Sequence, residues 1–137
     1  MLALLLATVV SCGDLCRAEA VAHYAELLAV GGYGRLPVEQ AGFLIRERDG
    51  TLTFAPWGRG AFQRATFAGG IPRGTIAVVH THPRRLPRPS RGDLDQAKRL
   101  GIPLVVVTPG AITAARPDGG VDTLFGAGWA SDSALRP

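Results

Sequence analysis

The residues best suited to chemistry lie between positions 80 and 93. His80 and His82 close an apolar run over residues 75–79, which predicts a buried strand. Alternate residues of a strand point to the same face, so both imidazoles can be directed at one point where the strand ends. Asp93 follows after a turn rich in proline and arginine. Two imidazole nitrogens and one carboxylate oxygen suit a zinc ion that keeps a fourth position open for water.

A hydrolytic zinc site also needs a base for the attacking water and a donor for the developing oxyanion. Glu39 is the candidate base, because it lies just before the start of a predicted strand over residues 41–46. If that strand runs beside the histidine strand, the Glu39 carboxylate can reach the water at the zinc. Asp95 is a helical step away from Asp93 and is interpreted as a solvated residue.

The elements that must position these residues follow from the hydrophobic period and the turn signals. Helices are expected over residues 14–30, with Asp14 as N-cap and Gly31 as stop, and from Ser90 to about residue 100. Strands are expected over residues 41–46, 51–56, 75–79, 104–107, 111–116 and 121–125, with irregular structure over 57–74. This order predicts an α/β fold, a single compact domain with a mixed central β-sheet flanked by helices.

The N-terminal region predicts export. Residues 2–10 form an apolar run that is too short to span a bilayer as a helix and has the length of a signal-peptide core. Residues 9–12 resemble a lipobox ending at Cys12, whereas residues 18–20 resemble an ordinary signal-peptidase site; an uncleaved element is the third interpretation. We therefore expect a signal or lipoprotein region over 1–20, a domain over 21–126 and a loose tail over 127–137. The protein would be periplasmic or lipid-anchored in the cell envelope, or cytoplasmic if the apolar run is not a signal.

Cys12 and Cys16 are the two cysteines of the chain. Their spacing suits a local disulfide that closes a very short loop and contributes little to the fold. Removal or lipidation of Cys12 would leave no intramolecular disulfide.

The formal net charge of +4 comes largely from arginine. Four arginines crowd the turn beside the expected metal site: Arg84, Arg85, Arg88 and Arg91. They either solvate the turn or form a rim that attracts a protein or peptide substrate with an acidic segment. Nucleic acid is not expected as a partner, because no helix-turn-helix pattern or basic helical stripe is present.

The spacing around the histidines resembles the JAMM motif of the JAB/MPN metalloprotease family, which is His-x-His, seven residues, Ser, two residues, Asp. His80, His82, Ser90 and Asp93 match it without a gap. Thr81 between the histidines is also usual in that family.

The upstream Glu-x-x-Gly-x-Leu pattern of the same family is matched by Glu39, Gly42 and Leu44. The resemblance extends from about Val21 to Phe125. The glycine-rich stretch 57–74 leaves no obvious room for the inserted segments with which deubiquitinating members grip ubiquitin, so the closer resemblance is to small prokaryotic JAB-domain proteins.

The resemblance implies a role for each matched residue. His80, His82 and Asp93 would bind one Zn2+ ion. Glu39 would hydrogen-bond the water at the zinc, act as general base and return the proton to the leaving amine, and Ser90 would help hold the tetrahedral intermediate. The implied reaction is hydrolysis of a peptide or isopeptide bond, on a three-layer fold similar to that of cytidine deaminases.

Other interpretations account for parts of the pattern. Ser90 and Asp93 also form a helix capping box. A non-catalytic zinc- or protein-binding JAB-fold module of the cell envelope would keep the fold without turnover. A zinc deaminase would need a Pro-Cys-x-x-Cys pair, which the sequence lacks.

Overall fold

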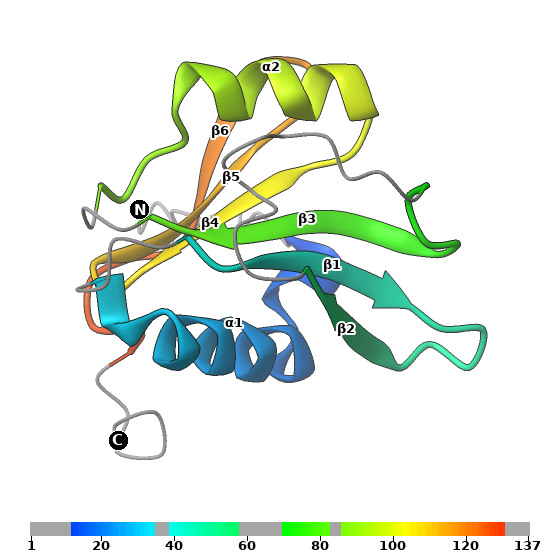
Figure 1. The fold of residues 1–137 in the computed structure, drawn as a ribbon, viewed down its shortest axis with the longest axis horizontal. Helices are drawn as coiled ribbons and strands as arrows, with labels where there is room; N and C mark the ends of the chain where they lie inside the picture. Colours follow the sequence, from blue (N-terminus) through cyan, green and yellow to red (C-terminus); the bar gives the residue numbers. More distant parts are fainter. Residues whose placement is uncertain (1–11, 35–38, 58–69, 83–85, 131–137) are drawn as a thin grey trace, which may run out of the picture.

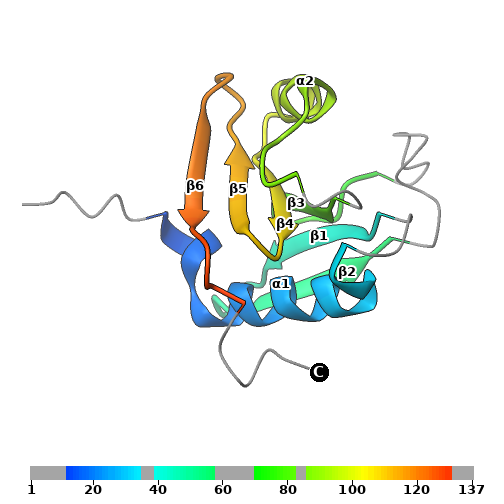
Figure 2. The same ribbon diagram turned by 90° about the vertical axis from the view of Figure 1, so that its left-hand side faces the viewer.

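The computed structural model describes residues 12–34, 39–57, 70–82 and 86–130. The strands in these ranges are β1 (Ala41–Arg46), β2 (Leu52–Pro56), β3 (Thr75–Thr81), β4 (Leu104–Thr108), β5 (Ala111–Ala115) and β6 (Val121–Phe125). They form one sheet in the order β2-β1-β3-β4-β5-β6. The two α-helices, α1 (Ala18–Val30) and α2 (Arg91–Leu100), lie on opposite sides of that sheet (Figures 1 and 2). The predicted α/β fold with a mixed sheet flanked by helices is confirmed.

The strand pairing places the start of β1 beside the end of β3. β1 runs antiparallel to both β2 and β3, and Ala41 of β1 pairs with His80 of β3. The chain then crosses over through α2 and returns as β4, which runs parallel to β3. Antiparallel pairs of β4 with β5 and of β5 with β6 complete the sheet. Residues just before β1 are therefore neighbours of residues at the end of β3.

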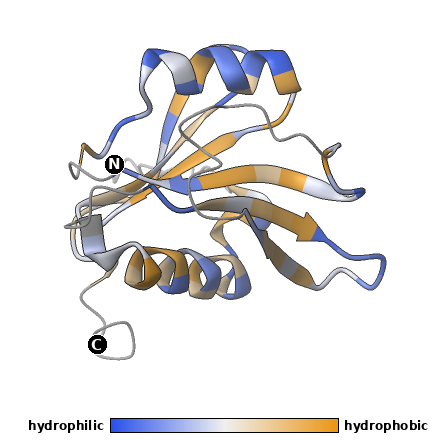
Figure 3. Ribbon diagram, in the orientation of Figure 1, coloured by the Kyte–Doolittle hydropathy of each residue, from blue (hydrophilic) through white to orange (hydrophobic). Residues whose placement is uncertain are grey.

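Alternation along the central strands divides the core into two layers. On the α1 side, Val79 of β3 and Val105 of β4 pack with Tyr24 and Leu28. Neighbouring strand residues face α2 instead, and they pack with Ala97. Each fully buried aliphatic side chain contributes about 1.5–3 kcal/mol. Figure 3 shows hydrophobic residues along these strands, whereas the loop joining β1 and β2 is hydrophilic.

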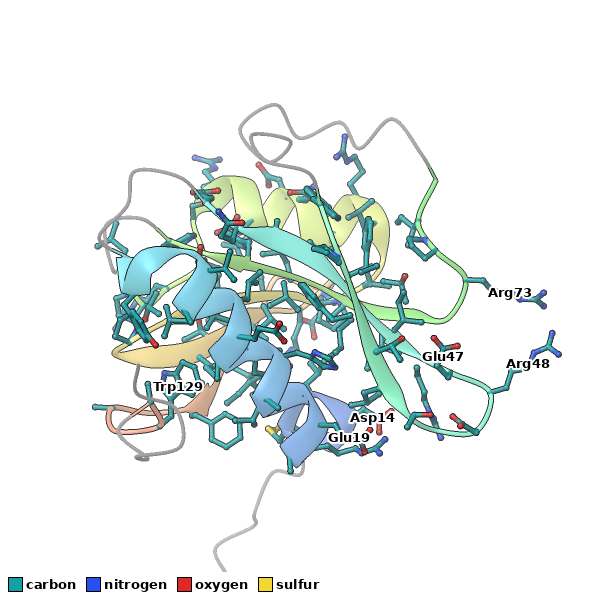
Figure 4. All side chains as sticks on the ribbon, turned by 60° about the horizontal axis from the view of Figure 1, so that its bottom comes forward. Asp14, Glu19, Glu47, Arg48, Arg73 and Trp129 are labelled. Atoms are coloured by element: carbon teal, nitrogen blue, oxygen red, sulfur yellow. A yellow bond between two sulfur atoms is a disulfide. The ribbon has the colours of Figure 1, made fainter. Side chains whose placement is uncertain are left out.

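The N-terminal helix begins later than the sequence predicts. Asp14 is not its N-cap: a 3-10 helix spans Gly13–Cys16, and the extended backbone of Arg17 precedes α1. Asp14 and Glu19 both form ion pairs with Arg17 (Figure 4). The Glu19 carboxylate also accepts the Leu52 N–H at 3.1 Å, which ties α1 to the start of β2. The predicted stop at Gly31 is confirmed.

A disulfide joins Cys12, which directly precedes this 3-10 helix, to Cys16, the last residue of the helix. None of the helices in the described ranges is long and apolar enough to cross a membrane. Residues 1–11, which carry most of the expected export signal, lie outside the described residues.

The C-terminal segment up to Ala130 is not the loose tail that the sequence predicts. Trp129 donates its indole N–H to the Thr108 carbonyl at 2.7 Å, and Trp129 and Ala130 pack against the α1-side core (Figure 4). Residues 131–137 of the expected tail lie outside the described residues, as do residues 58–69 of the expected irregular stretch. Trp57, at the start of that stretch, is buried in the α2-side core.

Candidate metal centre

The centre forms where β3 ends and α2 begins. His80 lies on β3 and is fully buried, and His82 directly follows the strand with 9% of its surface exposed. Val78, two residues before His80, packs in the α2-side core. Since alternate strand residues share a face, the histidines are directed toward α2. Asp93, which is 5% exposed, lies in the first turn of that helix.

The three predicted ligands meet through the Nε2 atoms of the two histidines and the carboxylate of Asp93. The Nε2 atoms of His80 and His82 are 3.0 Å apart. The Asp93 carboxylate lies 3.2 Å from each of them, through Oδ1 toward His80 and through Oδ2 toward His82. Ligands about 2.0–2.1 Å from a tetrahedral zinc ion stand roughly 3.3–3.4 Å from one another. The observed separations therefore fit the donor set of a zinc site after a small expansion.

A hydrogen bond behind His82 sets which of its ring nitrogens can bind a metal. Nδ1 of His82 lies 2.9 Å from the carbonyl oxygen of Leu86. A carbonyl only accepts, so the proton of the neutral ring resides on Nδ1 and the Nε2 lone pair faces His80 and Asp93. Histidine ligands of metals are commonly oriented by such a bond.

The turn that starts α2 orients Asp93. Ser90 is the N-cap: its hydroxyl accepts the Asp93 N–H at 3.1 Å, and Asp93 Oδ2 accepts the Ser90 N–H at 2.7 Å. The capping-box interpretation of this pair is therefore correct, and Asp93 still contacts both histidines. Because the Ser90 hydroxyl accepts in this bond, its own hydrogen can point outward, where the residue is exposed.

Charge and burial oppose each other at the two carboxylates. Burial raises the pKa of Asp93, but in the metal-free protein hydrogen bonds from His80, from the protonated His82 ring and from the Ser90 N–H outweigh it and hold that pKa well below its usual range. Burial raises the pKa of Glu39, the nearby histidines lower it and Asp93 raises it, with a net increase. Glu39 is thus coupled electrostatically to all three predicted ligands without belonging to their cluster.

Two hydrogen bonds hold the segment that carries Glu39 against the histidines. The Gln40 N–H donates to the Thr81 hydroxyl at 3.0 Å, and the Thr81 N–H donates to the Gln40 carbonyl at 2.9 Å. Thr81 lies between His80 and His82 in the sequence. Its two hydrogen bonds to Gln40 therefore tie the segment that carries Glu39 to the segment that carries both histidines.

The pKa of His82 is also set by opposing effects. Burial by itself lowers the pKa of His82. In the protonated ring of the metal-free protein, Nε2–H donates to Asp93 and Nδ1–H donates to the Leu86 carbonyl. These hydrogen bonds, together with the charges of Asp93 and Glu39, outweigh burial and raise that pKa.

Sequence reasoning missed the roles of Thr81 and Leu86. The role of Thr81 could have been inferred from its hydroxyl, which lies between two predicted ligands in the sequence. The role of Leu86 could not, because any residue type can supply a main-chain carbonyl. The structure also explains Gly42, for which a Cβ would lie 2.2 Å from Cζ of Phe54 and 2.7 Å from the Ala55 carbonyl oxygen. Asp95 is exposed, in line with its interpretation as a solvated residue.

Comparison with known families agrees with this geometry. The family model of the prokaryotic homologs of the JAB domain matches residues 34–118, which is more than half of the chain and includes every predicted site residue. No curated protein matches the chain at a significant level of similarity. From the extent of the family match, we conclude that the chain belongs to the prokaryotic homologs of the JAB domain.

Proposed function

We propose that the protein is a zinc-dependent hydrolase of JAMM type that cleaves a peptide or isopeptide bond with water. The observation that carries the proposal is the convergence of two buried histidine nitrogens and a buried carboxylate on one point. Such a donor set, with three protein ligands, is that of catalytic zinc sites that keep one position for water or substrate. A bound zinc ion would supply Lewis-acid polarisation of the scissile carbonyl and a lower pKa for the attacking water.

Glu39 is the group that moves the proton. In the metal-free protein burial raises the pKa of its half-buried carboxylate, and a general base works best when its pKa lies near the working pH. We assign it the removal of one proton from the attacking water and the delivery of that proton to the leaving amine nitrogen.

Ser90 supplies a donor for the oxygen of the scissile carbonyl. Its hydroxyl is kept beside Asp93 by the capping box, and the hydroxyl hydrogen is available to a bound substrate. A donor aimed at an oxygen that gains charge stabilises the transition state.

The decisive experiment compares the wild-type protein with Glu39→Gln on a library of proteome-derived peptides. New peptide termini are detected by mass spectrometry, and bound zinc is measured by elemental analysis. We expect Glu39→Gln to lose at least about a hundredfold in turnover while it retains wild-type zinc content. Asp95→Asn, which changes an exposed carboxylate on the same helix, is the matched control and should keep full activity.

Two results would contradict the proposal. Unchanged turnover in Glu39→Gln would remove Glu39 from the mechanism. Stoichiometric zinc in the wild-type protein without any cleavage, in the peptide library or in a panel of isopeptide-linked substrates, would favour the non-catalytic binding module.

We further propose that the substrate carries an acidic segment next to the cleaved bond. Arg88 is exposed on the stretch that joins the histidines to α2, and Arg91, the first residue of α2, is exposed as well. Neither takes part in an ion pair within the described ranges, whereas Arg17 and Arg116 are each paired with two carboxylates. Exposed cations beside a site raise the local concentration of an acidic ligand.

The acidic-segment proposal is tested with Arg88→Ala/Arg91→Ala. Exposed charge pairs contribute up to about 1 kcal/mol each, so KM for acidic substrates should rise up to about fivefold per arginine with little change in kcat. The control is Arg48→Ala/Arg73→Ala, at the far end of the sheet from the metal centre (Figure 4). Equal effects of the two double variants would refute a local rim.

We also propose that the protein is exported with Cys12 retained. A disulfide such as Cys12–Cys16 forms in oxidising compartments. Cleavage after Ala20 would remove Glu19, which binds Leu52, and the Leu15 carbonyl, which accepts the Tyr24 hydroxyl at 2.8 Å.

The intact mass of the mature protein tests the export proposal. It should show a chain that still contains Cys12, either disulfide-bonded or lipidated, since one thiol cannot do both. A mature chain that starts at Val21 would contradict the proposal.

A further inference from the structure

Leu86 accepts the hydrogen bond from His82 through its main chain, although its side chain is little packed against the rest of the protein. The Leu86 side chain is 62% exposed, although leucine is usually buried. Its carbonyl oxygen nevertheless lies 2.9 Å from Nδ1 of a histidine that is only 9% exposed. The position of Leu86 is therefore defined by its main chain rather than by burial of its side chain.

The chain around Leu86 is restricted on its C-terminal side. Pro87 follows it directly, and the residue before a proline is held in extended conformations. Pro89 precedes Ser90, whose capping box with Asp93 fixes the end of the turn. Both ends of this short stretch are thereby tied to predicted metal ligands, one end through His82 and the other through Asp93.

We propose that Leu86 is a positioning residue of the metal centre. Its carbonyl accepts the Nδ1–H of His82, which fixes the ring orientation and keeps the Nε2 lone pair directed at the ion. Pro87 keeps the carbonyl in place by restricting the backbone of Leu86. This inference rests on the metal site of the proposed function and adds to it a residue outside the matched motif.

A purely structural role for the same hydrogen bond predicts a different outcome. If the bond only stabilised the turn, its loss would lower the melting temperature of the metal-free protein and leave zinc affinity unchanged. A positioning role predicts the opposite result, in which zinc affinity falls more than the melting temperature of the metal-free protein does. Loss of a partner behind a metal-binding histidine typically lowers metal affinity by about 10- to 100-fold.

The test compares Leu86→Gly/Pro87→Gly with Leu86→Ala. The double variant keeps the carbonyl but frees the backbone that presents it, whereas Leu86→Ala removes only the exposed side chain and retains Pro87. Zinc affinity is measured by chelator competition, and thermal unfolding of the metal-free proteins is followed in parallel. We expect a zinc dissociation constant raised about 10- to 100-fold in the double variant and unchanged, within about threefold, in Leu86→Ala.

Nitrogen-15 NMR of the zinc-bound wild-type protein tests the same inference without any variant. The expected spectrum shows His82 with its proton on Nδ1 and zinc on Nε2. A proton on Nε2, or zinc on Nδ1, would overturn the proposal even if the double variant failed to fold. So would a folded double variant that binds zinc as tightly as the wild type.

None of these readouts depends on cleavage, so they separate the two proposals. A protein that binds zinc through Nε2 of His82 but hydrolyses nothing would support the role of Leu86 and refute the peptidase. Wild-type protein that binds no zinc would overturn both.

Discussion

Replacing Thr81 with valine tests how the base candidate is held. Valine keeps the shape of a side chain that is 2% exposed, and it removes the oxygen that accepts the Gln40 N–H at 3.0 Å. An amide left without its partner costs about 1–3 kcal/mol. Because Gln40 is only partly buried, we expect about 1–2 kcal/mol, which corresponds to a melting temperature lower by roughly 3–10 °C for a domain of this size.

The same change should lower turnover more than stability alone explains. Glu39 precedes Gln40, and a misplacement of about 1 Å in a catalytic group can lower the rate about a hundredfold. Zinc affinity should stay within a few-fold of wild type, because Thr81 supplies no predicted ligand atom. Thr81→Ser, which retains the hydroxyl, is the control and should keep most of the activity.

The assays for Thr81→Val are steady-state kinetics on a cleaved peptide, thermal unfolding and zinc titration, all performed below the melting temperature of the variant. Full kcat in a destabilised Thr81→Val protein would refute the role of Thr81 in placing Glu39. A large loss of zinc binding would instead show that Thr81 acts through the histidines.

Three further outcomes follow from the geometry. Zinc affinity should rise as pH increases, by about tenfold per pH unit below the pKa of His82, because the ring must lose a proton before it can bind the ion. That pKa lies above its ordinary 6.5 in the metal-free protein. A flat pH profile in a zinc titration would contradict this prediction. Asp93→Asn should lower zinc affinity at least about tenfold in chelator competition. The variant should retain α2, since an asparagine oxygen can still accept the Ser90 N–H. Equal affinity would exclude Asp93 as a ligand. Gly42→Ala should destabilise the fold by about 1–3 kcal/mol in urea unfolding, because a Cβ would contact Phe54 and the Ala55 carbonyl at 2.2 and 2.7 Å; an unchanged midpoint would show that β2 moves freely.

Elements with a strong local signal could be predicted from the sequence. β1 has the bounds that the strand pattern predicts, Ala41–Arg46, and the β-branched run 104–107 lies within the wholly buried strand β4. The start of α2 after Ser90 was also predicted, because the capping pattern is local. Proximity of Glu39 to the histidines depended on one assumption, that β1 pairs with β3, and the register confirms that pairing.

Features that depend on distant contacts could not be predicted. The helical period extends back to residue 14, but Arg17 adopts an extended backbone, so α1 begins at Ala18. The polar composition after residue 126 predicts a loose tail, whereas Trp129 finds a carbonyl acceptor on β4. The positioning of His82 by Leu86 likewise depends on a folded turn and a main-chain atom.

Zinc binding by His80 and His82 is tested most directly by X-ray absorption spectroscopy at the zinc edge, combined with elemental analysis, on the purified full-length protein and on His80→Ala/His82→Ala. We expect one zinc ion per wild-type chain, coordinated by two histidine nitrogens and light oxygen ligands, and almost no zinc in the double variant. Equal zinc content in the two proteins, or a zinc environment without histidine, would contradict zinc binding by these two residues.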